Sequence, residues 1–235
     1  MRFEYVVTEE TNPYRNLAAE QELMRHAASG TAILFLWCNA DTIVIGRNQD
    51  AGCECRVNEF LNAGGVIARR RSGGGAVYQD KGNLNFSLIC KTAERGACRY
   101  QELVSDVLRE FRLDAEYNGR NDVTVQGRKF SGNAVYEDGA VTCQHGTILV
   151  AADIEKMAYY LTPEKSKLER NHIKSVGSRV VNLSSLDAGI TVKSVARAFL
   201  RVTKATAADH EPDKDRLEKL TDFYKSDAWV YGGKA

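Results

Sequence analysis

The chain has 235 residues, 43% of them hydrophobic, which is enough to bury one substantial core. Its 32 basic and 31 acidic residues leave a formal net charge of +1, so no overall field favours a nucleic acid. No apolar run approaches the roughly 18 residues of a membrane-spanning helix, and acidic residues occupy the N-terminal stretch where a signal peptide would be apolar. We therefore expect a single domain, residues 1–235, in the cytoplasm, with no nucleic-acid or membrane partner and with free thiols at its six scattered cysteines.

Strand and helix patterns alternate irregularly along the chain. A helix is expected to start at Asn12 and Pro13, which suit the cap and the first helical position, and its apolar stripe ends at Gly30. Further helical patterns cover residues 56–63, 100–111, 153–161, 191–201 and 213–224. Strands are expected at residues 32–37, 42–45, 66–68, 76–78 and 84–90, as a hairpin of 123–125 with 129–136, and as a pair at 141–143 and 147–150 interrupted at His145 and Gly146. This order predicts an α+β fold with mixed or antiparallel sheets flanked by helices.

A glycine-rich stretch, RRRSGGGAVYQDKGNLNFS, occupies residues 69–87. Consecutive glycines favour a loop that turns sharply or approaches a ligand closely, and the preceding arginines add positive charge. The stretch equally fits a tight hairpin with solvated arginines. It matches neither the phosphate loop of P-loop proteins nor the dinucleotide-binding fingerprint. From these residues alone, an anion-binding loop and a plain hairpin both stay open.

A second polar cluster, NGRNDVTVQGRKFSGNA, covers residues 118–134 and places Lys129 on a hairpin strand. A lysine there is either a donor held near developing negative charge or an ordinary solvated side chain. His145 lies in CQHGTIL between apolar residues, where most histidines are structural. Trp37 ends an apolar strand and fits a core position. None of these residues identifies a function by itself.

Taken together, FLWCNADT, VIGRNQD, ARRRSGGGAVYQDKGNLNFS, GRNDVTVQGRKFSGNA and QHGTIL occur in the order and spacing of one family. The chain resembles the lipoate–protein ligase A family, within the wider class II biotin/lipoate ligase fold, over about residues 12–205. The closing Trp-x-Tyr-Gly at residues 229–232 resembles the end of the large catalytic domain of that family.

The resemblance implies an ATP-dependent ligase that acts in two steps. Lipoate attacks the α-phosphorus of Mg-ATP to give lipoyl-adenylate and pyrophosphate. A lysine of a lipoyl domain in a 2-oxoacid dehydrogenase E2 subunit, or of the glycine-cleavage H protein, then attacks this anhydride. By motif, Lys129 would be catalytic and would contact both the acyl carbonyl and the phosphate. The resemblance also implies that the loop over lipoyl-adenylate consists of Arg70, Ser72, Gly73, Gly74 and Gly75. The adenylate end would be held by Asn83, Asn121 and Asp122, with Asp122 also near Mg²⁺. The acyl chain would be lined by Trp37, Tyr78 and His145, and a further substrate contact would come from Arg47.

Many members of the family carry a small C-terminal accessory domain that supports adenylation, and the printed sequence stops where it would begin. A separate accessory subunit, truncation, or a protein that only performs transfer would each explain this, and we favour the first two because Lys129 and the glycine loop are intact.

Three alternatives stay open. One is an ATP-independent octanoyl or lipoyl transferase, which would need a cysteine nucleophile such as Cys143. Another is a non-catalytic lipoate-binding module. Biotin as substrate fits the fold but ranks below these, because biotin ligases use a differently composed loop.

Overall fold

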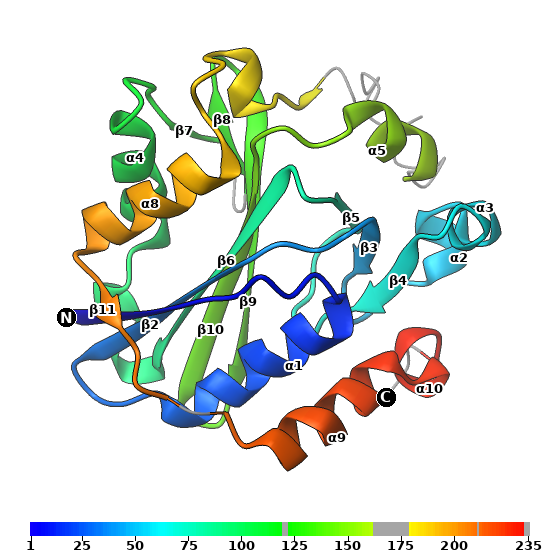
Figure 1. The fold of residues 1–235 in the computed structure, drawn as a ribbon, viewed down its shortest axis with the longest axis horizontal. Helices are drawn as coiled ribbons and strands as arrows, with labels where there is room; N and C mark the ends of the chain where they lie inside the picture. Colours follow the sequence, from blue (N-terminus) through cyan, green and yellow to red (C-terminus); the bar gives the residue numbers. More distant parts are fainter. Residues whose placement is uncertain (119–121, 162–178, 211, 233–235) are drawn as a thin grey trace.

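The computed structural model describes residues 1–118, 122–161, 179–210 and 212–232 (Figure 1). An eight-stranded sheet has the order β11-β1-β2-β6-β10-β9-β8-β7, in which β1 runs parallel to β11 and β2 and the other neighbours are antiparallel. Its strands are β1 (Arg2–Val7), β2 (Thr31–Trp37), β6 (Asn83–Lys91), β7 (Glu116–Asn118), β8 (Asp122–Val125), β9 (Arg128–Asp138), β10 (Val141–Leu149) and β11 (Thr206–Ala207).

Helices cover both faces of this sheet because its central strands are apolar on both sides. In β2, Ile33 and Phe35 point to one face and Leu34 and Leu36 to the other, as the two-residue period of a strand requires. The first face packs against α1 (Pro13–Leu23) and α9 (Lys214–Lys225), and the second against α4 (Tyr100–Arg109) and α8 (Val192–Thr203) (Figure 1). Short 3₁₀ segments at Met24–His26, Thr92–Ala97 and Leu183–Ser185 complete the connections.

A three-stranded sheet, β4-β3-β5, forms a separate small layer on the right in Figure 1. It consists of β3 (Thr42–Ile45), β4 (Val66–Arg69) and β5 (Val77–Gln79), with β3 parallel to β4 and antiparallel to β5. Its apolar side chains pack with those of α2 (Ala51–Glu54), α3 (Val57–Asn62), α5 (Ile154–Tyr160) and α10 (Asp227–Val230). The loop between β4 and β5 contains the three consecutive glycines, so this small sheet supports that loop from both ends.

The α+β class and the helices and strands expected at these positions are confirmed, with shifts of a few residues at their ends. The Asn12 side chain accepts hydrogen bonds from the N–H groups of Tyr14 and Arg15, which is the expected cap of α1. The sequence analysis did not predict β1, β7, β11, α2 or α10. The strands at residues 32–37 and 42–45 belong to different sheets, because the intervening turn leads out of the large sheet and into the small one.

The expected interruption at His145 and Gly146 is wrong. Both residues continue the ladder of β10, where His145 pairs with Ser87 on one side and Ala134 on the other. Gly146 is a packing position: a Cβ there would lie 2.6 Å from the Phe86 ring and 2.9 Å from the Gly132 carbonyl oxygen. The glycine therefore accommodates close neighbours within an unbroken strand.

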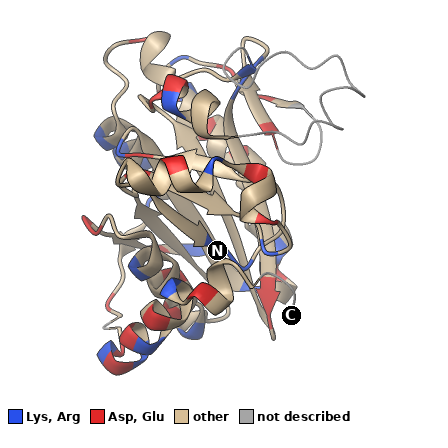
Figure 2. Cartoon of the chain, turned by 90° about the vertical axis from the view of Figure 1, so that its right-hand side faces the viewer, with Lys and Arg blue, Asp and Glu red and all other residues tan. Residues whose placement is uncertain are grey.

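All six cysteines are free thiols. No helix within the described ranges is both long and apolar enough to cross a membrane. Acidic and basic residues are interspersed over the elements drawn in Figure 2. That mixture is in keeping with the near-zero net charge, and local clusters are the places to look for an anion site.

Candidate functional site

A cavity of about 180 Å³ lies between the loop of residues 72–76, here called the glycine loop, and strands β8 to β10. The lining includes the apolar side chains of Leu17 and Trp37 and the charged groups of Asp122 and Lys129. An apolar wall facing a few convergent polar groups is the usual composition of a small-molecule site.

Lys129 and Asp122 form an ion pair at the cavity, with Nζ and Oδ1 2.7 Å apart. The two residues lie on adjacent antiparallel strands, and a glycine at position 132 leaves room for the lysine, since a Cβ on Gly132 would be 3.1 Å from Nζ. Their side chains are 38% and 45% exposed, so water screens the attraction. The lysine can therefore turn toward a bound anion at little cost.

Arg70 holds the glycine loop from beneath. Its Nη2 donates to the carbonyl oxygens of Gly73 and Gly75, both at 2.8 Å, its Nη1 donates to the Val44 carbonyl oxygen at 3.1 Å, and its Nε donates to Ser72 Oγ at 3.0 Å. The guanidinium is buried, and burial lowers the pKa of Arg70 to about 10 although Glu20 opposes the shift. Arg70 is thus a brace for the loop as well as part of the cavity lining.

The backbone N–H groups of Gly74 and Gly75, unlike the carbonyls bonded to Arg70, are not hydrogen-bonded within the described part of the chain. Among the described residues, none accepts a hydrogen bond from either group. Both glycines line the cavity. The Gly73 carbonyl shares a peptide plane with the Gly74 N–H and is turned toward Arg70, so this N–H points away from Arg70 and is available to an anion. Gly74 has φ +95°, a conformation that a side chain would strain.

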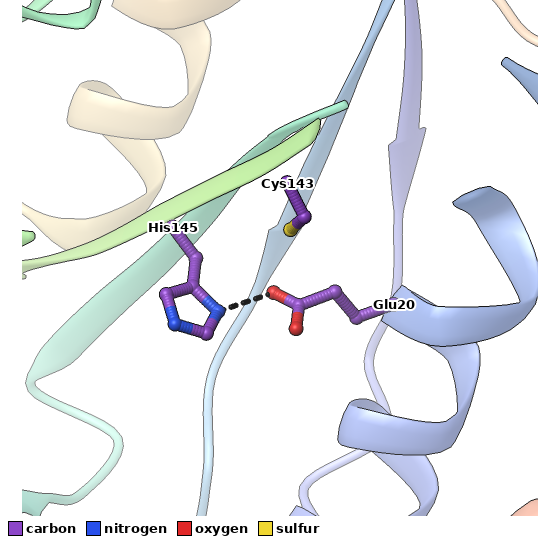
Figure 3. A group of neighbouring side chains, drawn as sticks. All are labelled: Glu20, Cys143 and His145. Carbon is purple, nitrogen blue, oxygen red and sulfur yellow. Dashed lines mark hydrogen bonds and ion pairs between the residues drawn. The ribbon is translucent and has the colours of Figure 1, made fainter. Parts of the chain in front are cut away.

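A buried chain of hydrogen bonds connects Arg70 with Glu20, which projects from α1 toward His145 on β10 (Figure 3). Ser72 Oγ lies 2.6 Å from His145 Nε2, and His145 Nδ1 lies 2.8 Å from Glu20 Oε1. Ser87 also donates to Glu20 Oε1, at 2.5 Å. The cavity wall is tied to the same group, because Trp37 Nε1 donates to Ser87 Oγ at 3.3 Å.

Burial alone would raise the pKa of Glu20. The attraction of the His145 ring whenever that ring is protonated, and hydrogen bonds from His145, Ser87 and Cys143, outweigh burial, so the pKa of this carboxyl lies below its ordinary value. Glu20 is therefore ionised at neutral pH even though it is only 1% exposed.

Glu20, Cys143 and His145 also present an oxygen, a sulfur and a nitrogen within 4.8 Å of one another, a set that could ligate a metal. Two observations disfavour this use. Both nitrogens of His145 already have partners, and burial followed by the charge of Glu20 raises the pKa of the Cys143 thiol well above its ordinary value. A metal would need that thiol as thiolate. We interpret the group as a hydrogen-bonded network.

Arg69 fixes two segments next to the glycine loop, namely α10 and the one that follows β3. Its guanidinium, 1% exposed, donates to the carbonyl oxygens of Gly46, Arg47 and Gln49 after β3 and of Trp229 and Val230 in α10. The Arg47 N–H donates to the Ser72 carbonyl oxygen at 2.9 Å. A Cβ on Gly46 would lie 2.2 Å from the Gly74 carbonyl oxygen. The segment after β3 and the glycine loop are therefore in direct backbone contact.

The structure places a little over half of the predicted site residues at one cavity. Those that line it are Trp37, Arg70, Gly74, Gly75, Asp122, Lys129 and His145. Ser72 and Gly73 lie behind the lining, in the bonds with Arg70, and the Arg47 side chain is exposed outside it. Asn121 lies outside the described residues.

The arginines of residues 69–71 do not lie together on a solvated face, which was the plain-hairpin interpretation of this stretch. Arg69 and Arg70 are buried, and only Arg71 is near the surface, where it pairs with Asp138 at 3.2 Å. Their donors point to backbone carbonyls because a buried guanidinium has to satisfy its N–H groups.

The structure does not bring Tyr78 to the cavity. Its ring packs against Phe60 in the core of the small sheet, and its hydroxyl donates to Asp41 at 2.8 Å. Alternation along β5 explains the difference, because Val77 and Gln79 line the cavity and Tyr78 must point to the opposite face. The expected place of Tyr78 along the acyl chain is therefore wrong, because its side chain lies in the core of the small sheet.

Asn83 is fully buried and donates from Nδ2 to Asn85 Oδ1 at 3.1 Å. It is Asn85 that lines the cavity. Asn83 Oδ1 and Asn85 Nδ2 have no partner among the described residues. Unmet hydrogen-bonding groups beside a cavity indicate a place where a polar ligand or water contributes.

Sequence reasoning missed Glu20, Gly46 and Asn85. Glu20 stands in an ordinary helical pattern, and its partner His145 lies 125 positions later in the chain, so no local motif marks the pair. Gly46 follows a strand as many turn glycines do. A polar residue on the buried side of an amphipathic helix is the one signal that could have drawn attention to Glu20.

Comparison with known proteins adds independent evidence. The lipoate-protein ligase A of Blochmanniella floridana is 40% identical over 222 residues, which cover 91% of this chain and 66% of that protein. This chain thus spans just under two thirds of the length of that relative.

Two solved structures are similar over nearly the whole chain. The bi-partite lipoate protein ligase of an archaeal lipoylation system from Thermoplasma acidophilum, studied with its E2 lipoyl domain, has a TM-score of 0.81 and 25% identity and covers 100% of this chain and 97% of its own. The lipoate complex of LipL1 from P. falciparum has a TM-score of 0.79 and 28% identity and covers 99% of this chain and 75% of its own.

The description of the matching family is lipoyl protein ligase A/B catalytic domain, and the match covers residues 12–204. Because this match spans most of the chain, the protein belongs to the lipoyl protein ligase A/B catalytic domain family.

Proposed function

We propose that the protein is an ATP-dependent lipoate–protein ligase that attaches a lipoyl group to a lysine of a lipoyl domain or of an H protein. The observation that carries the proposal is the cavity itself, which joins an apolar wall containing Trp37, a cation at Lys129 and the amides of Gly74 and Gly75, for which the described part of the chain offers no acceptor. A lipoyl chain needs the apolar wall, while a carboxylate and a phosphate need the cation and the amides. The lipoate-bound relative and the partner of the archaeal ligase agree with this substrate and this carrier.

In the first step, a lipoate carboxylate oxygen attacks the α-phosphorus of ATP, an acyl–phosphate bond forms, and pyrophosphate leaves. In the second step, the amine of the carrier lysine attacks the lipoyl carbonyl, an amide forms, and AMP leaves. Negative charge develops first on the phosphate and then on the carbonyl oxygen. Lys129 is placed to follow that charge, because its present partner Asp122 is half exposed and holds it weakly.

Mg²⁺ would accompany the nucleotide and neutralise its phosphate charge. Asp122 is the sole carboxylate lining the cavity among the residues that the structure describes. One carboxylate combined with phosphate oxygens and water is an ordinary ligand set for Mg²⁺. Asp122 therefore fits the group once Lys129 has turned to the substrate.

The main alternative is a transferase that carries the acyl group on a cysteine without ATP. Cys143 was its candidate nucleophile, but this thiol has no exposed surface and a raised pKa. A nucleophile needs access and thiolate character, so burial argues against Cys143 in that role.

The test combines the chain with lipoate, Mg-ATP and an apo lipoyl domain, with preformed lipoyl-adenylate replacing lipoate and ATP in a parallel reaction. Mass spectrometry reads the mass of the carrier. Modification in both reactions would support a complete ligase. Modification from the adenylate alone would support the transfer half-reaction with adenylation assisted by a separate accessory subunit, a division in keeping with the bi-partite archaeal relative. An unmodified carrier in both would refute the proposal.

A further inference from the structure

We propose that Glu20 is a positioning residue for the glycine loop: through His145 it fixes the direction of the Ser72 hydroxyl and thereby the conformation of the loop over the substrate. The inference rests on the proposed ligase function for its kinetic consequence and on the unliganded protein for its structural one. Glu20 does not itself line the cavity, so it acts through the residues that it contacts.

The hydrogens along the chain of bonds can be placed one after another. Arg70 Nε always carries a hydrogen and donates it to Ser72 Oγ. Glu20 is a carboxylate and only accepts, so the hydrogen between it and His145 belongs to Nδ1. The neutral imidazole then has a bare Nε2, and the Ser72 hydroxyl donates to it across 2.6 Å. All donors therefore point the same way, from Arg70 to Glu20.

Charge balance supports this arrangement. Arg70 and Glu20, 7% and 1% exposed, lie at opposite ends of the chain of bonds and carry opposite charges. With a single hydrogen on the His145 ring, the charges of Arg70 and Glu20 balance within this chain of bonds, whereas a second hydrogen would add a positive charge beside Arg70. Tyr136, Cys143 and Tyr224 are further ionisable groups near Glu20, and they are neutral because burial raises the pKa of each well above its ordinary value.

Glu20 also joins the two walls of the cavity. Its Oε1 accepts from Ser87, which in turn accepts from the Trp37 indole, and the same oxygen accepts from His145. Loss of the carboxylate would remove the hydrogen bonds that hold the His145 imidazole and, through Ser87, the Trp37 indole. We therefore expect both the loop and the apolar wall to lose their fixed positions.

The first experiment measures the ¹⁵N chemical shifts of the His145 imidazole in the unliganded full chain, assigned by comparison with His145→Gln. The wild type should carry its hydrogen on Nδ1. Glu20→Met, which has similar volume but no acceptor, should populate both tautomers. Glu20→Gln should restore the wild-type tautomer, because one amide oxygen can accept both bonds that Oε1 accepts. A wild-type Nε2–H tautomer, or an unchanged tautomer in Glu20→Met, would overturn the proposal.

The second experiment measures lipoyl transfer from preformed lipoyl-adenylate to an apo lipoyl domain. We expect kcat/KM of Glu20→Met to fall by about 10- to 100-fold, because a misplaced loop no longer orients the substrate. The kcat/KM of Glu20→Gln should stay within about threefold of wild type. Glu22→Met is the matched control. Glu22 is equally buried on the same helix, yet it pairs with Arg25 and Arg216, so its loss should lower stability and leave kcat/KM within about threefold of wild type. Equal losses in the two methionine variants would refute positioning by Glu20.

Ser72→Ala keeps the test decisive if Glu20→Met does not fold. It removes the donor to Nε2 and leaves Glu20 in place, so the hydrogen should remain on Nδ1. A switch to Nε2 would show that Ser72, and not Glu20, sets the tautomer. Absence of lipoyl transfer by the wild type even from preformed lipoyl-adenylate would refute the ligase function, while the spectra would still decide the role of Glu20.

Discussion

Gly46 does not line the cavity, and its replacement by alanine should displace the glycine loop from behind. The new Cβ would lie 2.2 Å from the Gly74 carbonyl oxygen, whereas ordinary contact begins near 3.4 Å, so the backbone of one segment has to move by about 1 Å. Arg69 holds the Gly46 side, Arg70 holds the loop side, and the bond from the Arg47 N–H to the Ser72 carbonyl oxygen joins the two, which leaves few ways to relax. We expect a loss of about 1–3 kcal/mol in the free energy of unfolding, as for other overpacked sites.

The kinetic effect should exceed the effect on stability. A shift of about 1 Å in groups that orient a substrate can cost roughly 100-fold in rate, so kcat/KM for lipoyl transfer should fall by about that factor. The assay is transfer to an apo lipoyl domain, with Tm measured in parallel. Gly96→Ala is the control, because a Cβ there meets no atom within 4 Å and that glycine does not have a positive φ. Wild-type kcat/KM in Gly46→Ala would refute the contact between these two segments as a determinant of loop position.

The remaining predictions concern four charged or nucleophilic groups. Lys129→Ala should lower transfer by about 100- to 1,000-fold with little change in Tm. Lys156→Ala removes another half-exposed lysine, which pairs with Asp41, and should leave transfer unchanged. Cys143→Ala should retain transfer and lose about 1 kcal/mol of stability through a small cavity, and loss of transfer in a folded variant would revive the thioester route. Arg69→Lys cannot reproduce the bonds to five carbonyl oxygens and should lower the free energy of unfolding by about 2–4 kcal/mol, seen as a reduced urea midpoint. Folding lowers the pKa of Glu20, so its carboxylate stabilises the protein above the unfolded pKa of 4.5, and this stabilisation is lost as the pH falls through the folded pKa. In urea unfolding at decreasing pH, the difference in the free energy of unfolding between wild type and Glu20→Gln should therefore shrink.

Local patterns in the sequence predicted the parts of the fold that depend on local chemistry. The cap at Asn12, the apolar run of β2 and the hairpin of residues 123–125 with 129–136 are each determined by neighbouring residues, and they occur where expected. His145 and Gly146 misled the analysis because a glycine in a strand can mark either a break or a tight contact. The contact is with Phe86, some 60 positions earlier in the chain, and only the folded sheet shows it.

The candidate site divides in the same way. Resemblance to a family identified residues of the glycine loop and Lys129, and the structure places Lys129 at the cavity. The resemblance did not indicate that the Arg70 donors are directed to backbone carbonyls, or that Tyr78 faces away from the cavity. Both features depend on which side of a strand or loop a residue occupies. Glu20 has no motif at all. Its position becomes evident only when α1 packs against β10 and brings a carboxylate to an imidazole.

One wall of the cavity is rigidly bonded and the other is held weakly, and this difference suits the proposed reaction with its two successive charged transition states. Buried charges are costly unless they are fully bonded, and here Glu20, Arg69 and Arg70 are bonded to groups that fix one loop. The amides of that loop are therefore preorganised and need not rearrange when charge develops. Lys129 is the opposite case, a half-exposed cation whose bond to Asp122 is screened by water. A fixed wall can hold the adenylate through both steps, while a cation that turns easily can move from the phosphate to the acyl oxygen between them.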